Sequence, residues 1–119
     1  MANTLFIIDD EEDIRFSLSI WFKRIGYDVK TFSNSEELLK GYEKDIPNLI
    51  LLDVNLNGED GREICKHLKH DLSLSAPILL FSANPANGEN YKQYEASDFI
   101  SKPFSLAEIA NIIASHISC

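Results

Sequence analysis

The sequence predicts an α/β fold, a doubly wound five-stranded parallel sheet with helices on both faces. Short apolar runs alternate along the chain with segments whose apolar residues recur at helical spacing. This alternation is typical of parallel strands joined by right-handed helical crossovers. Three of the runs are apolar at every position, as expected for strands covered on both faces. The chain has 119 residues, which is the length of one domain, so we predict a single domain over residues 1–119.

The predicted strands are the short apolar runs of the chain. Residues 5–8, 49–52 and 78–81 are the runs that are apolar throughout, and residues 27–32 and 99–100 complete the set of five. Because the carboxyl ends of parallel strands lie at one edge of the sheet, the residues that follow these runs are expected to form the site.

The predicted helices follow from apolar periodicity and from their start and stop signals. Gly26 ends the first helical pattern. Ser33 with Glu36, and Ser105 with Glu108, read as capping boxes that open the second and the last helix. The apolar positions of the four patterns are Ile14, Leu18, Trp21 and Ile25; Leu38, Leu39 and Tyr42; Ile64 and Leu68; and Leu106, Ile109, Ala110, Ile113 and Ile117.

The segment after the fourth strand is poor in helix-forming residues. Residues 84–88 read Asn-Pro-Ala-Asn-Gly, which is turn chemistry, and only residues 91–96 leave room for a helix. We therefore expect a helix here that is short or partly disordered and that begins no earlier than about Gly88.

Composition excludes several classes of function. A net charge of −8 gives no electrostatic affinity for phosphate backbones or anionic lipids, so direct nucleic-acid and membrane binding are not expected. No long apolar run or basic, apolar leader is present in these 119 residues. The two cysteines, Cys65 and Cys119, form no disulfide framework or metal-ligand spacing, and a cytoplasmic location fits them best.

Three carboxylates, one hydroxyl and one amine follow the predicted strands. Asp9 and Asp10 follow the first strand, Asp53 the third, Ser82 the fourth, and Lys102 the fifth. Adjacent carboxylates repel one another unless a cation lies between them, and oxygen ligands of this kind suit Mg2+. Mg2+ and an ammonium group beside a carboxylate are what phosphoryl transfer onto that carboxylate requires. Each residue alone has a commoner explanation as a cap, turn or solvated residue, but their coincidence at four strand ends favours a site.

The chain resembles the receiver domain of two-component response regulators, of the chemotaxis-regulator type. The segments that carry this resemblance are residues 5–11 (Leu-Phe-Ile-Ile-Asp-Asp-Glu), 47–53 (Pro-Asn-Leu-Ile-Leu-Leu-Asp), 77–83 (Pro-Ile-Leu-Leu-Phe-Ser-Ala) and 97–104 (Ser-Asp-Phe-Ile-Ser-Lys-Pro-Phe). The resemblance implies a flavodoxin-like (βα)5 fold with strand order 2-1-3-4-5. It also implies a signalling domain and not an enzyme, one that catalyses only its own phosphorylation and dephosphorylation.

The resemblance assigns a role to each site residue. Asp53 is expected to accept the phosphoryl group, from a histidine kinase or a histidine phosphotransfer protein. Asp9, Asp10 and Asp53, with the backbone carbonyl of Asn55, are expected to hold Mg2+. Lys102 and Ser82 are expected to assist at the phosphoryl group, Lys102 by its charge and Ser82 by donating a hydrogen bond to a phosphoryl oxygen.

The resemblance also implies a conformational switch. Ser82 is expected to supply the switch hydroxyl and Phe99 the switch aromatic ring, and the Lys102–Pro103 peptide is expected to be cis. We further hypothesise that residues 84–90 become ordered when the site is phosphorylated. The output partner is unknown, and the domain is expected to be a monomer or a phosphorylation-dependent dimer.

Some positions depart from the family pattern. Receivers usually have Pro four residues after the phosphoacceptor, where this chain has Asn57, so we expect a looser loop there. Gly61 stands where the family expects Gly, whereas Ser97 replaces the Gly usual before the fifth strand.

Three other functions fit the sequence less well. A flavin binder shares the fold but needs a phosphate loop where this chain has acidic residues, and an aspartyl phosphatase needs an Asp where this chain has Asn55. A receiver that no longer takes phosphate is disfavoured because all five site residues are kept. We expect no output domain within these residues, and whether the domain stands alone is left open.

Overall fold

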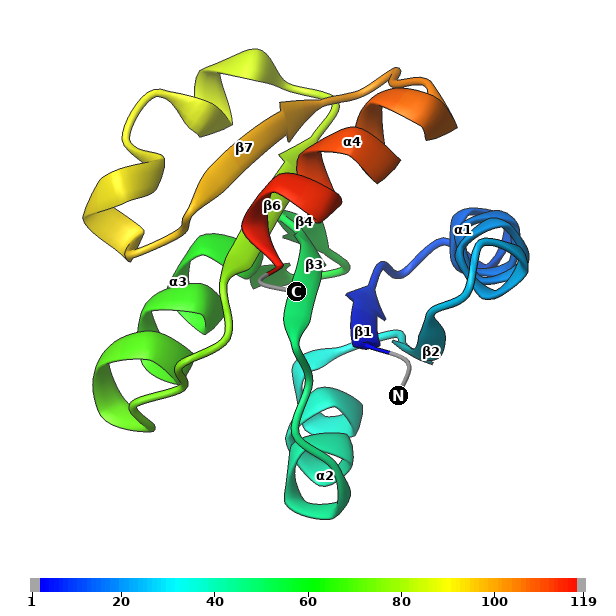
Figure 1. Ribbon diagram of the computed structural model, residues 1–119. Helices are drawn as coiled ribbons and strands as arrows, with labels where there is room; N and C mark the ends of the chain where they lie inside the picture. Colours follow the sequence, from blue (N-terminus) through cyan, green and yellow to red (C-terminus); the bar gives the residue numbers. More distant parts are fainter. Residues whose placement is uncertain (1–2, 118–119) are drawn as a thin grey trace.

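The computed structural model describes residues 3–117 and confirms the predicted parallel sheet (Figure 1). The order of its strands is β2-β1-β3-β6-β7, and every neighbouring pair is parallel. Counted within this sheet alone, that is the predicted order 2-1-3-4-5. The strands are β1 (Thr4–Ile8), β2 (Asp28–Phe32), β3 (Leu49–Asp53), β6 (Ile78–Ser82) and β7 (Asp98–Ser101).

Helices cover both faces of the sheet, as the alternating sequence predicts. Side chains of a strand point alternately to opposite faces, so the apolar strands fill two cores. Leu18 and Phe22 of α1 and Ile109 of α4 pack on one face, while Leu38 of α2 and Cys65 of α3 pack on the other. The helices are α1 (Glu12–Arg24), α2 (Ser35–Lys44), α3 (Gly61–Lys66), which continues as a π-helical turn (His67–Asp71), and α4 (Leu106–His116).

One of the two predicted capping boxes is wrong by one residue. The cap of α2 is Asn34, whose side chain accepts the amide N–H of Glu37 at 2.9 Å. The Glu37 carboxylate in turn accepts the amide N–H of Ser33 at 2.8 Å. Asn is as effective a cap as Ser, and the sequence signal could not separate the two registers. The cap of α4 is Ser105, as predicted, and it accepts an amide N–H at 3.0 Å.

The segment before β7 contains no α-helix, and the predicted start at Gly88 is wrong. The first helical turn begins at Pro85, because a fixed φ and a missing N–H suit the first position of a helix. The side chain of Asn84 caps it by accepting the amide N–H of Ala86 at 3.1 Å. The segment forms two 3-10 turns, Pro85–Gly88 and Tyr91–Tyr94.

The loop after β3 is an ordered hairpin, and the expectation of a looser loop is wrong. Strands β4 (Asn55–Leu56) and β5 (Glu59–Asp60) pair antiparallel across a two-residue turn. The turn residues Asn57 and Gly58 have φ of 32° and 94°. Two-residue hairpin turns of this kind need positive φ at both positions, and Asn-Gly is the preferred pair. Proline, with φ near −65°, could not take the place of Asn57 in this turn.

The helices and the cysteines bear on the expectations drawn from composition. No helix within residues 3–117 is long and apolar enough to cross a membrane. Cys65 is buried and free, and burial raises the pKa of its thiol to about 12. Cys119 lies outside the described residues.

Candidate functional site

Strand register brings the predicted site residues to one edge of the sheet. Ile8 at the end of β1 lies beside Leu52 of β3, so the residues that follow, Asp9 and Asp53, are neighbours. Ser82, the last residue of β6, pairs with the last residue of β7, and its carbonyl accepts the amide N–H of Lys102 at 2.8 Å. The expected convergence of strand ends is therefore present in the fold.

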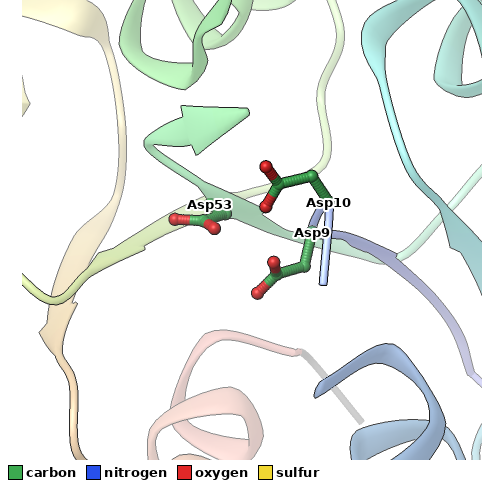
Figure 2. A group of neighbouring side chains, drawn as sticks. All are labelled: Asp9, Asp10 and Asp53. Carbon is green, nitrogen blue, oxygen red and sulfur yellow. The ribbon is translucent and has the colours of Figure 1, made fainter. Parts of the chain in front are cut away.

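Three carboxylates point toward one another at this edge. Each of Asp9, Asp10 and Asp53 offers an oxygen atom, and these atoms all lie within 4.8 Å of one another (Figure 2). Asp9 is fully buried and Asp53 is 3% exposed, whereas Asp10 is open to solvent. Buried carboxylates at this separation repel strongly, and oxygen donors that leave one side open fit Mg2+, which keeps several waters.

An ammonium group lies against two of the carboxylates. The Nζ atom of Lys102 is 3.2 Å from Oδ2 of Asp9 and 3.5 Å from Oδ2 of Asp53. It also lies 4.6 Å from the ring centroid of Phe81, a cation–π contact that holds the side chain over the site. The peptide between Lys102 and Pro103 is cis, as predicted.

Backbone amides of the β3–β4 segment orient two of the carboxylates. The N–H of Asn55 donates to Oδ1 of Asp53 at 3.2 Å. The N–H of Asn57, in the hairpin turn, donates to Oδ2 of Asp10 at 3.1 Å. A proline at position 57 would have no N–H to donate, so this departure from the family pattern gives the site a hydrogen bond that the usual residue cannot make.

Arg15 contributes to the site although sequence reasoning did not single it out. Its Nη1 atom donates to the backbone carbonyl of Asp9 at 2.6 Å, from the first part of α1. This contact ties α1 to the backbone at the end of β1. The available signal was a basic residue two positions after the acidic helix start, which is also typical of a solvated helix face.

The pKa of Asp53 is raised by its surroundings. Burial, and secondly the neighbouring charge of Asp9, raise the pKa of Asp53 to about 7, against the lowering effect of Lys102. One ammonium group therefore does not compensate the carboxylates that surround it. A divalent cation would favour the ionised form of Asp53, the form that can act as a nucleophile.

Neither of the two predicted switch residues hydrogen-bonds to a carboxylate of the cluster in residues 3–117. Ser82 is fully buried, and its Oγ atom accepts the amide N–H of Asn84 at 3.1 Å and the Nδ2 group of Asn87 at 2.9 Å. Phe99 is half-buried and packs on the core face that α2 and α3 cover. Sequence reasoning missed Asn87, whose only signal was its place in a turn-rich segment.

The chain matches a known protein family and a curated protein. Residues 5–114 match the response regulator receiver domain family. The chain is 40% identical over 111 residues to the alkaline phosphatase synthesis transcriptional regulatory protein PhoP of Bacillus subtilis (strain 168). This match covers 92% of the chain and 46% of PhoP, so the chain spans about half the length of that relative.

Solved structures with the same fold include several receivers. The chemotaxis protein CheY4 of Vibrio cholerae has a TM-score of 0.90 over 98% of this chain and 100% of its own, at 23% identity. The response regulator protein TrrA of Thermotoga maritima, in complex with Mg2+-BeF, has a TM-score of 0.87 over 97% of this chain and 99% of its own, at 24% identity. At these identities the structures show a shared fold.

Proposed function

Because the chain belongs to the response regulator receiver domain family, we propose that it is a phosphorylation-dependent signalling domain with Asp53 as its phosphoacceptor. The position of the Asp53 carboxylate carries this proposal. It lies with two further carboxylates at the carboxyl edge of the sheet and within 3.5 Å of the ammonium group of Lys102. The phosphodonor is a histidine kinase or a histidine phosphotransfer protein, as is general in the family.

The chain's own residues have separate parts in the proposed reaction. A carboxylate oxygen of Asp53 attacks the phosphorus of a phosphohistidine, so a P–O bond forms while the P–N bond breaks and its electron pair stays on the imidazole. Lys102 stabilises charge on the transferred group. Asp9, Asp10 and Asp53, with the carbonyl of Asn55, would hold Mg2+, which neutralises charge on the phosphoryl oxygens.

Mass spectrometry after incubation with acetyl phosphate and Mg2+ tests the proposal. We expect one phosphoryl group on the protein and none on the Asp53→Asn variant. Asp28→Asn is a matched control, because Asp28 is an exposed carboxylate at the start of β2, away from the site. Labelling of the Asp53→Asn variant at the level of the control would refute the assignment.

The consequence of phosphorylation is proposed to be a conformational switch. The hydroxyl of Ser82 would turn toward the phosphoryl group and the ring of Phe99 would follow, changing the surface seen by a partner or an attached output domain. We propose that residues 1–119 form one receiver domain that acts in the cytoplasm and has no separate substrate. Absence of turnover of a generic phosphate ester, with Asp53 phosphorylation intact, would fit this proposal, whereas steady turnover would contradict it.

A further inference from the structure

The hydroxyl of Ser82 is held entirely by its own loop. Its Oγ atom accepts two hydrogen bonds, from the amide N–H of Asn84 at 3.1 Å and from the side chain of Asn87 at 2.9 Å. A hydroxyl oxygen has two lone pairs, so both are occupied here. Ser82 is fully buried, and water therefore cannot easily replace either donor.

The 3-10 turn Pro85–Gly88 contacts both switch residues at once. Asn87 reaches Ser82 from this turn, and the next residue, Gly88, lies against the ring of Phe99. A Cβ atom built on Gly88 would lie 2.4 Å from Cδ2 of Phe99, so the backbone of the turn touches the ring. The turn is thus tied to one switch residue by a hydrogen bond and to the other by packing.

We propose that Asn87 is a positioning residue that holds the Ser82 hydroxyl in the unphosphorylated conformation, and that breaking this hydrogen bond releases the Pro85–Gly88 turn. This inference rests on the proposed function. Phosphoryl oxygens only accept hydrogen bonds, so Ser82 must aim its O–H at Asp53 to bind them. In this proposal the Ser82 side chain turns toward Asp53 to do so, and its Oγ atom leaves the 2.9 Å hydrogen bond from Asn87.

The hydrogen bond between Asn87 and Ser82 bears on the behaviour of residues 84–90. We hypothesised from the sequence that this segment becomes ordered on phosphorylation. In the structure, the segment is already tied to Ser82 through Asn87 and capped by Asn84. Release of the turn from Ser82 therefore accounts better for a change in residues 84–90 than ordering does.

Calorimetric titration with beryllofluoride in saturating Mg2+ tests the inference. If the hydrogen bond stabilises only the free state, the Asn87→Ala variant will bind beryllofluoride roughly 3- to 10-fold more tightly than the wild type, the worth of one hydrogen bond. Asn90→Ala is the matched control, since Asn90 is exposed and its side chain makes no hydrogen bond within residues 3–117. The control should bind as the wild type does.

A double-mutant cycle separates a bond to Ser82 from general loosening of the turn. In the Ser82→Ala background, Asn87→Ala should no longer change the affinity, because the bond partner is gone. The side chain in Asn87→Ser is too short to reach Ser82, so this variant should also bind beryllofluoride more tightly than the wild type. It replaces Asn87→Ala in the test if the alanine variant does not fold. Wild-type protein that fails to bind beryllofluoride would overturn the proposed function itself. Normal wild-type binding, with unchanged or weaker binding by the folded Asn87 variants, would overturn this inference alone.

Discussion

Gly61 lies where the start of α3 meets the backbone of the proposed phosphoacceptor. A Cβ atom at this position would lie 2.1 Å from the carbonyl oxygen of Asp53, and that contact is with backbone, which cannot swing away. We predict that Gly61→Ala lowers the free energy of unfolding by about 1–3 kcal/mol and slows phosphorylation by displacing Asp53. Urea denaturation and labelling by acetyl phosphate measure the two effects.

Glu63, two residues further on the same helix, provides the control for Gly61. Its side chain is exposed, so Glu63→Ala should change stability by no more than about 0.5 kcal/mol and leave labelling unaltered. Equal effects of the two substitutions would show that the close approach at Gly61 is unimportant.

Asp10 is the carboxylate whose removal is best tolerated by the fold, because it is exposed. Its Oδ2 atom accepts the amide N–H of Asn57, which holds the carboxylate toward the other two. We predict that Asp10→Asn weakens Mg2+ binding by at least about 10-fold, since a charged ligand is replaced by a neutral amide. Calorimetry measures this change. Asp13→Asn, on the exposed side of α1, is the control and should bind Mg2+ like the wild type.

At the scale of secondary structure, the β4–β5 hairpin depends on the conformation of its two turn residues. Asn57 has φ of 32°, which glycine adopts easily and proline cannot. We predict that Asn57→Gly changes the free energy of unfolding by less than about 1 kcal/mol, whereas Asn57→Pro lowers it by about 2 kcal/mol or more. Chemical denaturation of both variants checks this. If Asn57→Pro left the free energy of unfolding unchanged, the loop would have to adopt a second conformation.

The sheet could be predicted from the sequence because one physical effect dominates it. Strands buried on both faces must be apolar throughout, and β1, β3 and β6 are fully buried apart from Thr4. The 3-10 turns depend in addition on contacts with other elements, such as the packing of Gly88 on Phe99. Those contacts join residues far apart in sequence, so local propensity does not contain them.

The candidate site also has parts that follow from the strand boundaries and parts that depend on contacts between elements. The positions of Asp9, Asp53 and Lys102 follow from the rule that parallel strands end at one edge, which needs only the strand boundaries. The contacts of Arg15 with Asp9 and of Asn87 with Ser82 depend on where side chains of a helix and a turn reach. Sequence patterns carry no information of that kind, and these residues became visible only in the structure.

At the scale of the whole molecule, stability should depend on pH in two opposing ways. The pKa of Asp53 is raised from 3.8 to about 7 by burial and by Asp9, so its ionisation destabilises the folded state. That destabilisation is complete above about pH 7 and is removed as pH falls toward 3.8. Hydrogen bonds from Arg62 lower the pKa of Asp60, and those from Ser33 lower that of Glu37. Stability from these two groups is lost only at lower pH, as they become protonated.

We therefore predict that the metal-free protein becomes more stable as pH falls from 8 to about 5, and less stable below about 4. The net charge of −8 acts in the same direction over the first interval, because protonation reduces self-repulsion. Urea denaturation in the presence of a chelator measures the profile. The Asp53→Asn substitution should raise the free energy of unfolding at pH 8 and make it depend less on pH between about 5 and 8. Saturating Mg2+ should have the same two effects, because it binds the ionised carboxylates of the folded state.

An identical pH dependence in the wild type and the Asp53→Asn variant would show that the buried carboxylate is not its source. Asp28→Asn, which removes one exposed charge from β2, separates this local effect from the general effect of net charge.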